Sequence, residues 1–180
     1  LPISRPRPGG TSAKRRISAL DASKALLETA QFTARHAQLY ADAPEKSGPW
    51  LVTGAVLMAQ QAAALALKMA GDSIPAQAGA TELLLRAANK ERLPAPHTLP
   101  LGMAARSGFD RLVEARNGFM HPRGTVWFVS KTSLSQGLPV AVQTVRHLML
   151  TQPIDATLCT APKALDDALS DIDALAEFLT

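Results

Sequence analysis

The twenty residues from Trp50 to Met69 constrain the fold of this chain more than any other segment. Apart from Thr53, a pair of glutamines and Lys68, they are apolar, and alanine and leucine dominate them. A helix of this composition is apolar on nearly every side, so other helices must cover it almost completely. A membrane span at residues 51–71 would need about 20 strongly apolar residues, and alanine is too weakly apolar for this. We therefore predict a buried helix at the centre of a bundle, and no membrane partner.

The composition agrees with an α-helical protein. Hydrophobic residues make up 47% of the 180-residue chain, aromatic residues only 4%, and the apolar residues are mostly alanine and leucine. These residues favour helices over strands, and the length fits one domain. The single cysteine, Cys159, excludes an internal disulfide framework and any metal site built from several cysteines. Its free thiol is typical of a cytoplasmic protein, and we predict no cofactor and no metal.

Hydrophobic spacing and turn residues predict five helices. These cover residues 18–42, 50–69, 81–92, 103–121 and 163–179. Pro44 and the turn at residues 47–49 are expected to separate the first two, and Thr81 is expected to cap the third. Three prolines make residues 93–102 irregular.

The segment between the last two predicted helices is harder to assign. Residues 125–130 resemble a short strand, and residues 140–150 fit either a strand or a helix that begins at Pro139. We therefore expect a mainly α protein, a four- to five-helix up-and-down bundle. A small irregular or β-like insertion at residues 125–150 follows the helix at 103–121.

Charge is distributed unevenly along the chain. Lys and Arg number 19 against 15 Asp and Glu, a net charge of +4, but residues 1–16 alone hold five basic residues and no acid. These first residues are rich in Pro, Gly and Arg, and we predict a disordered basic arm followed by a single domain at 17–180. A second basic excess lies at residues 86–131, where eight bases accompany three acids. That excess indicates either an anionic ligand or ordinary surface variation.

One helix end combines three side chains suited to work on a phosphodiester. The chain reads Arg116-Asn117-Gly118-Phe119-Met120-His121, and Pro122 follows at once. Asn117 and His121 are four residues apart and share one face of a helix, and the long Arg116 side chain can reach the same patch. A guanidinium binds phosphate bidentately, and an imidazole that titrates near neutral pH exchanges protons with a ribose hydroxyl or a leaving oxygen. The amide of Asn117 can orient the ribose or the imidazole.

This string resembles the signature of the HEPN family of helical-bundle ribonucleases. That signature is an Arg followed four to six residues later by His, commonly with a polar residue such as Asn directly after the Arg. The resemblance is sharp over residues 112–124 and loose over residues 18–125, where a long central helix follows the Pro49-Trp50 turn.

The resemblance implies a function and an assembly. It implies a homodimer in which both motifs face one cleft, and metal-independent cleavage of single-stranded RNA through attack of a ribose 2′-hydroxyl on the adjacent phosphate. Arg116 would bind the scissile phosphate, and His121 would act as acid and base. Asn117 would position the reacting groups. Many members are toxins of toxin–antitoxin or anti-phage systems, and a nucleotidyltransferase-type antitoxin is then a partner.

Other interpretations stay open at this stage. The pair Arg92 and His97 has the same spacing, but Pro94 and Pro96 between them prevent one helix from carrying both. The domain would alternatively be a non-catalytic HEPN-like module that binds RNA, a nucleotide or a protein. If the motif is accidental, His121 stabilises the helix end and Arg116 pairs with Glu114 or Asp110.

Several residues near the motif are candidates for contacts to RNA. Arg106, Arg111 and Arg123 flank it and are predicted to bind backbone phosphates, or else to be solvated surface. The aromatic residues Phe109, Phe119, Trp127 and Phe128 are candidates for base stacking, although core packing is the better interpretation for Phe109 and for one of Trp127 and Phe128.

Overall fold

The computed structural model describes residues 10–120 and 129–180, and for the first helix it describes side chains from Ala19 onward. These residues form six α-helices and one short π-helical turn, and they contain no strand. The elements are α1 (Gly10–Leu39), α2 (Pro44–Met69), α3 (Ala80–Ala87), α4 (Met103–Met120), α5 (Lys131–Arg146), η1 (His147–Thr151) and α6 (Pro162–Phe178). The prediction of a mainly α bundle is confirmed.

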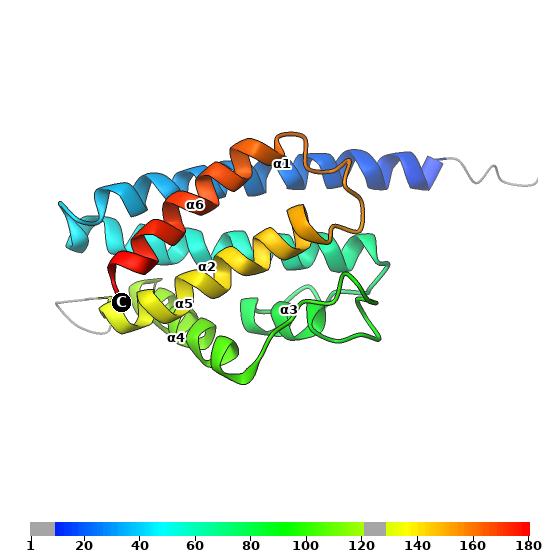
Figure 1. The fold of residues 1–180 in the computed structure, drawn as a ribbon. Coiled ribbons are helices and arrows are strands. Elements are labelled where there is room, and N and C mark those ends of the chain that lie inside the picture. The colour runs from blue at the N-terminus through cyan, green and yellow to red at the C-terminus, as the bar shows by residue number, and fades with distance from the viewer. Residues whose placement is uncertain (1–9, 121–128) are drawn as a thin grey trace, which may run out of the picture.

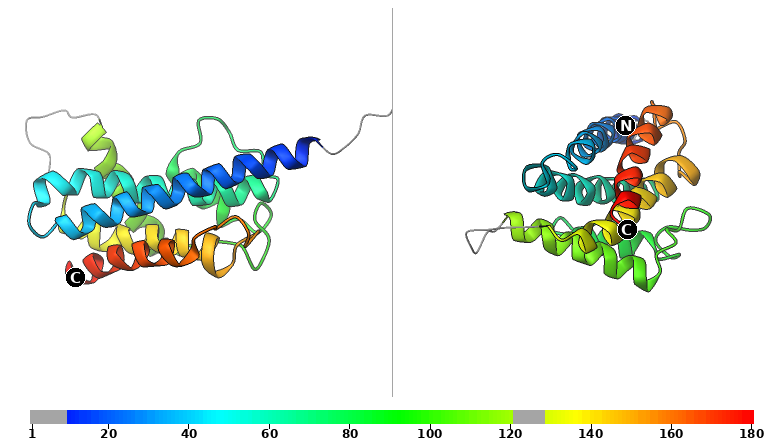
Figure 2. Two further views of the ribbon diagram at one scale, coloured as in Figure 1. Left: turned by 90° about the horizontal axis from the view of Figure 1, so that it is seen from above. Right: turned by 60° about the vertical axis from the view of Figure 1, so that its left-hand side comes forward.

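Four helices form a closed ring of contacts. α1 packs against α2, α2 against α5, α5 against α6, and α6 returns to α1 (Figures 1 and 2). α4 packs on the outside of this ring, against α2 and α5, and the short α3 contacts α2 and α4. A continuous hydrophobic core runs through all six helices. The helix that carries the Arg116 motif is therefore an outer helix of the bundle.

The central position predicted for residues 50–69 is confirmed. α2 contacts four of the other helices, and its leucines, valines and alanines are almost all inaccessible to solvent. By length and composition α2 could cross a membrane, but 67% of its most apolar window is buried inside the bundle. Gly71 ends the helix with a φ of +86°, and its amide and that of Asp72 cap the carbonyls of Lys68 and Leu67.

The N-terminal boundaries of the first two helices differ from the prediction. α1 begins at Gly10, so residues 10–16, expected in a disordered arm, form its first turns; residues 1–9 lie outside the described residues. Beyond the last proline, this stretch contains alanine, lysine and arginine, which favour helix. α2 begins at Pro44, a first-turn position where a proline fits, and continues through Pro49. The turn expected at residues 47–49 is thus helical, and Ser47, Gly48 and Pro49 are buried.

The cap predicted for the third helix is also wrong. α3 begins at Ala80 with Gly79 as its N-cap. The hydroxyl of Thr81 instead donates a hydrogen bond of 2.8 Å to the Asp110 carboxylate of α4. A tertiary partner therefore replaces the local backbone partner that the sequence rule assumes. The irregular conformation predicted for residues 93–102 is confirmed.

The segment predicted as an insertion supplies a core helix. α5 begins after Ser130, whose hydroxyl accepts a hydrogen bond of 3.0 Å from the Ser133 amide, and it continues through Pro139. Its buried side chains include Leu134, Leu138, Ala141, Val142 and Val145. Residues 125–128 of the expected strand lie outside the described residues, while 129 and 130 are irregular. The expectation of a β-like insertion is therefore wrong for the described part of this segment.

Two glycines let α4 lie directly on α5. A Cβ built on Gly108 would lie 2.5 Å from the Gln136 carbonyl oxygen, and one on Gly137 would lie 2.8 Å from the Leu112 Cβ. Real Cβ atoms cannot approach so closely, so this crossing depends on glycine at both positions. Phe109 and Leu112 are fully buried beside it, which confirms the core interpretation of Phe109. The crossing fixes the position of α4 and of the motif at its end.

Candidate active site

Arg116 and Asn117 lie near the C-terminal end of α4. The Arg116 side chain donates two hydrogen bonds to the Asn117 amide oxygen, from Nε at 3.2 Å and from Nη2 at 2.9 Å. Arg116 is half-buried and Asn117 is exposed. The amide thus holds the guanidinium at the surface of the helix end without neutralising its charge.

Arg116 makes no ion pair among the residues that the structure describes. If the motif were accidental, Arg116 would be expected to pair with Glu114 or Asp110. Asp110 instead accepts a hydrogen bond from the Thr81 hydroxyl, and its Oδ2 lies 3.7 Å from Nε of Arg106. A guanidinium whose hydrogen bonds go to a neutral amide keeps its full charge available for an external anion. This local geometry agrees with a phosphate-binding role for Arg116.

His121 and Arg123 lie outside the described residues. His121 directly follows Met120, the last residue of α4, and its side chain has no described contacts. The site that the structure describes therefore consists of Arg116 and Asn117.

The other two flanking arginines are engaged elsewhere on α4. Arg111 precedes Arg116 by five residues, which places it about 140° away around the helix, and it donates to the Gln136 side chain of α5. Arg106 lies about 15 Å along the helix from Arg116 and pairs with Asp110. The structure therefore does not bring Arg106 and Arg111 together with Arg116, because helical geometry separates these positions.

The competing pair Arg92 and His97 is not a site either. Arg92 donates a hydrogen bond of 2.9 Å to Asp72, which also binds Arg86, and His97 Nδ1 lies 2.9 Å from the Gln152 carbonyl oxygen. Burial alone would raise the pKa of the Asp72 carboxyl, but the hydrogen bonds and charges of Arg86 and Arg92 outweigh it and lower that pKa. This cluster ties the segment after α2 to α3 and has a structural role.

Phe119, a stacking candidate from the sequence, belongs to an aromatic cluster whose other members the sequence does not indicate. Trp50 at the start of α2 makes edge-to-face contacts with Phe119 of α4, at a centroid distance of 5.5 Å, and with Phe32 of α1, at 6.4 Å. Phe32 also contacts His36 at 4.5 Å. Burial, with a smaller contribution from the Arg35 charge, lowers the pKa of His36. Phe32 and Trp50 are separated in sequence from the motif, so no local pattern connects them to it; Trp127 and Phe128 lie outside the described residues.

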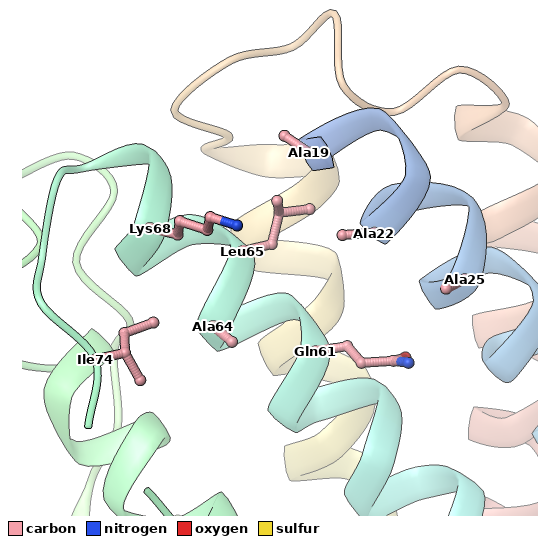
Figure 3. A pocket seen from close by; sticks show the side chains of 8 residues that line it. All are labelled: Ala19, Ala22, Ala25, Gln61, Ala64, Leu65, Lys68 and Ile74. Atoms are coloured by element: carbon pink, nitrogen blue, oxygen red, sulfur yellow. The ribbon is translucent and has the colours of Figure 1, made fainter. Parts of the chain in front are cut away.

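A separate pocket lies between the N-terminal half of α1 and the C-terminal half of α2. It has a volume of about 350 Å³ and a mostly apolar lining, and the Gln61 side chain points toward α1 within it (Figure 3). Its lining comprises Ala19, Ala22, Ala25, Gln61, Ala64, Leu65, Lys68 and Ile74. Gln61 follows Trp50 by eleven residues, about 16 Å along α2. The pocket is therefore remote from the motif and contains none of the predicted site residues.

Comparisons with protein-family models, with curated proteins and with solved structures gave no significant match.

Proposed function

We propose that this protein is a metal-independent endoribonuclease of the HEPN type that cleaves single-stranded RNA. The observation that carries the proposal is the environment of Arg116, whose guanidinium bonds to the Asn117 amide and to no described carboxylate at the end of a helix that leads directly to His121. Phosphodiester cleavage needs a cation for the phosphate and a group that exchanges protons, and the sequence places a histidine directly after the helix that carries this cation.

The chemistry assigns one role to each residue. His121 takes the proton from a ribose 2′-hydroxyl, whose oxygen then attacks the adjacent phosphorus while the bond to the 5′-oxygen breaks. Arg116 stabilises the negative charge that develops on the phosphate oxygens. Asn117 keeps the guanidinium aimed at the phosphate. The leaving 5′-oxygen then takes a proton from the protonated His121. The products are a 2′,3′-cyclic phosphate and a 5′-hydroxyl.

The resemblance to HEPN proteins also motivates the proposed assembly and context. We propose a homodimer in which the two α4 ends face one cleft, since α4 is an outer helix of the bundle and its end is accessible. We further propose that the chain is a cytoplasmic toxin of a toxin–antitoxin or anti-phage system, neutralised by a nucleotidyltransferase-type antitoxin.

A cleavage assay in EDTA tests the proposal. We expect the wild-type protein to cleave single-stranded RNA, and His121→Ala and Arg116→Ala to lose at least about 100-fold of that activity. His97→Ala is the matched control. His97 has the same spacing from an arginine as His121, but its ring contacts the Gln152 carbonyl and is not part of the motif.

Three outcomes separate the alternatives. Equal cleavage by wild type and His121→Ala would refute the assigned role. Binding of RNA that depends on Arg116 but yields no product would identify a non-catalytic module. Loss of activity in His97→Ala to the same degree would point to a general effect on folding.

A further inference from the structure

Three aromatic rings from different helices meet beside the motif, and two of them are unusually accessible. Trp50 is 47% exposed and Phe32 is 40% exposed, while Phe119, near the end of α4, is half-buried and contacts Trp50. We call Phe32, Trp50 and Phe119 the aromatic platform. These ring contacts join α1, α2 and α4. In Figure 1, α4 ends at the same end of the bundle as the turn between α1 and α2.

The aromatic platform adjoins the guanidinium of Arg116, which bonds to Asn117 and makes no ion pair among the described residues. Phe119 follows Arg116 by three residues, which places the two side chains on neighbouring positions of one helix face. The adjacent Met120 is also 57% exposed. An accessible apolar surface therefore borders a guanidinium that has no described carboxylate partner. A nucleotide has the complementary arrangement, with a flat apolar base joined to an anionic phosphate.

We propose that Trp50, flanked by Phe32 and Phe119, is a base-stacking platform that holds an unpaired base next to the phosphate bound by Arg116. This inference rests on the proposed ribonuclease function and names the residues that select its substrate. Both neighbouring rings lie nearly perpendicular to the indole, at 86° and 73°, so neither is stacked parallel to it. The exposed part of the indole is thus available to a base.

The platform selects single-stranded over double-stranded RNA. In a duplex each base is already stacked and paired, so its face is available only after unpairing. Phenylalanine rings offer no hydrogen-bonding groups and the indole offers a single donor, so stacking on them tolerates any base. We therefore expect a preference for unpaired RNA with weak discrimination among the four bases.

Binding measurements on a non-cleaving His121→Ala background test the platform. The probe is a 12-nucleotide oligoadenylate, compared with the same strand paired to oligouridylate and with inorganic polyphosphate. We expect Trp50→Ala to weaken binding of the single strand about 5- to 150-fold and Trp50→Phe to retain most of it. Phe178→Ala, which removes a 74% exposed aromatic ring from α6, is the matched control and should leave binding unchanged.

Intrinsic fluorescence provides a second readout that does not require loss of a side chain. The chain has two tryptophans, so Trp127→Phe leaves Trp50 as the sole tryptophan, whose emission is excited selectively at long wavelength. We expect the single strand to quench Trp50 emission, and polyphosphate to leave it unchanged. This readout applies even if Trp50→Ala fails to fold.

The outcomes distinguish this inference from the proposed function. If Arg116→Ala weakens binding but Trp50→Ala does not and Trp50 emission is unchanged, the platform is refuted and the ribonuclease proposal stands. Absence of any RNA binding would refute both. A change of oligomeric state in Trp50→Ala, without quenching by RNA, would place the platform between two copies of the chain and also refute the inference.

Discussion

At the scale of single residues, the guanidinium of Arg116 and the amide of Asn117 act as one unit. The two hydrogen bonds converge on one amide oxygen, which restricts the arginine rotamer while leaving its charge intact. The position of Arg116 and Asn117 near the end of a helix could be predicted from the sequence, because the hydrophobic spacing indicates the helix and Pro122 follows it; His121 lies outside the described residues. The Trp50 contact could not, because it joins residues that are remote in the chain.

Replacing Asn117 by aspartate tests the importance of a neutral partner. Asn117→Asp is nearly isosteric, but its carboxylate would pair with Arg116 and repel the phosphate. We expect kcat/KM for RNA cleavage to fall at least about tenfold with unchanged thermal stability, and Asn117→Gln to be less impaired. An Asn117→Asp variant with wild-type kcat/KM would show that the charge of Arg116 is not used.

The Asp72 carboxylate is expected to stabilise the fold and to have no direct part in RNA cleavage. It is only 10% exposed and binds Arg86 at 2.8 Å and Arg92 at 2.9 Å. Asp72→Asn should lower the free energy of unfolding by about 1–3 kcal/mol at neutral pH. Because folding lowers this pKa, the stabilisation is present above the ordinary aspartate pKa and is lost as the pH falls through the lowered value.

Denaturant titrations of both proteins measure this effect. The difference in unfolding free energy between wild type and Asp72→Asn should shrink as the pH falls through the aspartate range. A difference that stays constant down to the most acidic measurable pH would contradict the assigned cause.

At the scale of elements, proline was the least reliable guide to helix boundaries. Pro49 lies within α2 and Pro139 within α5, although each costs its helix a backbone hydrogen bond. Both helices bury most of an apolar face, and this packing outweighs the local cost. α4 and α6 were predicted within one or two residues because each has an apolar stripe, and a proline follows α4 and begins α6.

The α4–α5 crossing is the element-scale feature that positions the motif. Gly108→Ala would place a methyl group 2.5 Å from a backbone oxygen of α5, and backbone cannot move aside as a flexible side chain can. We expect the free energy of unfolding to fall by about 1–3 kcal/mol, together with a loss of cleavage activity. Thermal or chemical denaturation measures the first effect.

Gly102→Ala is the matched control for this substitution. Gly102 directly precedes α4, and a Cβ there meets no atom within 4 Å. The free energy of unfolding of Gly102→Ala should stay within about 0.5 kcal/mol of that of the wild type. Equal stability of the two variants would contradict the close approach of α4 and α5.

At the scale of the whole molecule, the helices divide into a ring of four and two outer helices, α3 and α4. The ring of α1, α2, α5 and α6 contributes most of the core, while α4 packs on the outside of the ring with its C-terminal end accessible. The bundle could be predicted because the apolar segment at residues 50–69 requires neighbours on all sides. The closure of the ring by α5 could not, because residues 140–150 fit helix and strand patterns equally.

The chemical nature of the RNA ends produced in EDTA tests the central claim most directly. If Arg116 and His121 direct a 2′-hydroxyl onto the adjacent phosphate, each cut leaves a 2′,3′-cyclic phosphate and a 5′-hydroxyl, and His121→Ala leaves neither. Mass spectrometry of a cleaved oligonucleotide distinguishes these ends from others. Products with 3′-hydroxyl and 5′-phosphate ends, or identical products from His121→Ala, would contradict the account.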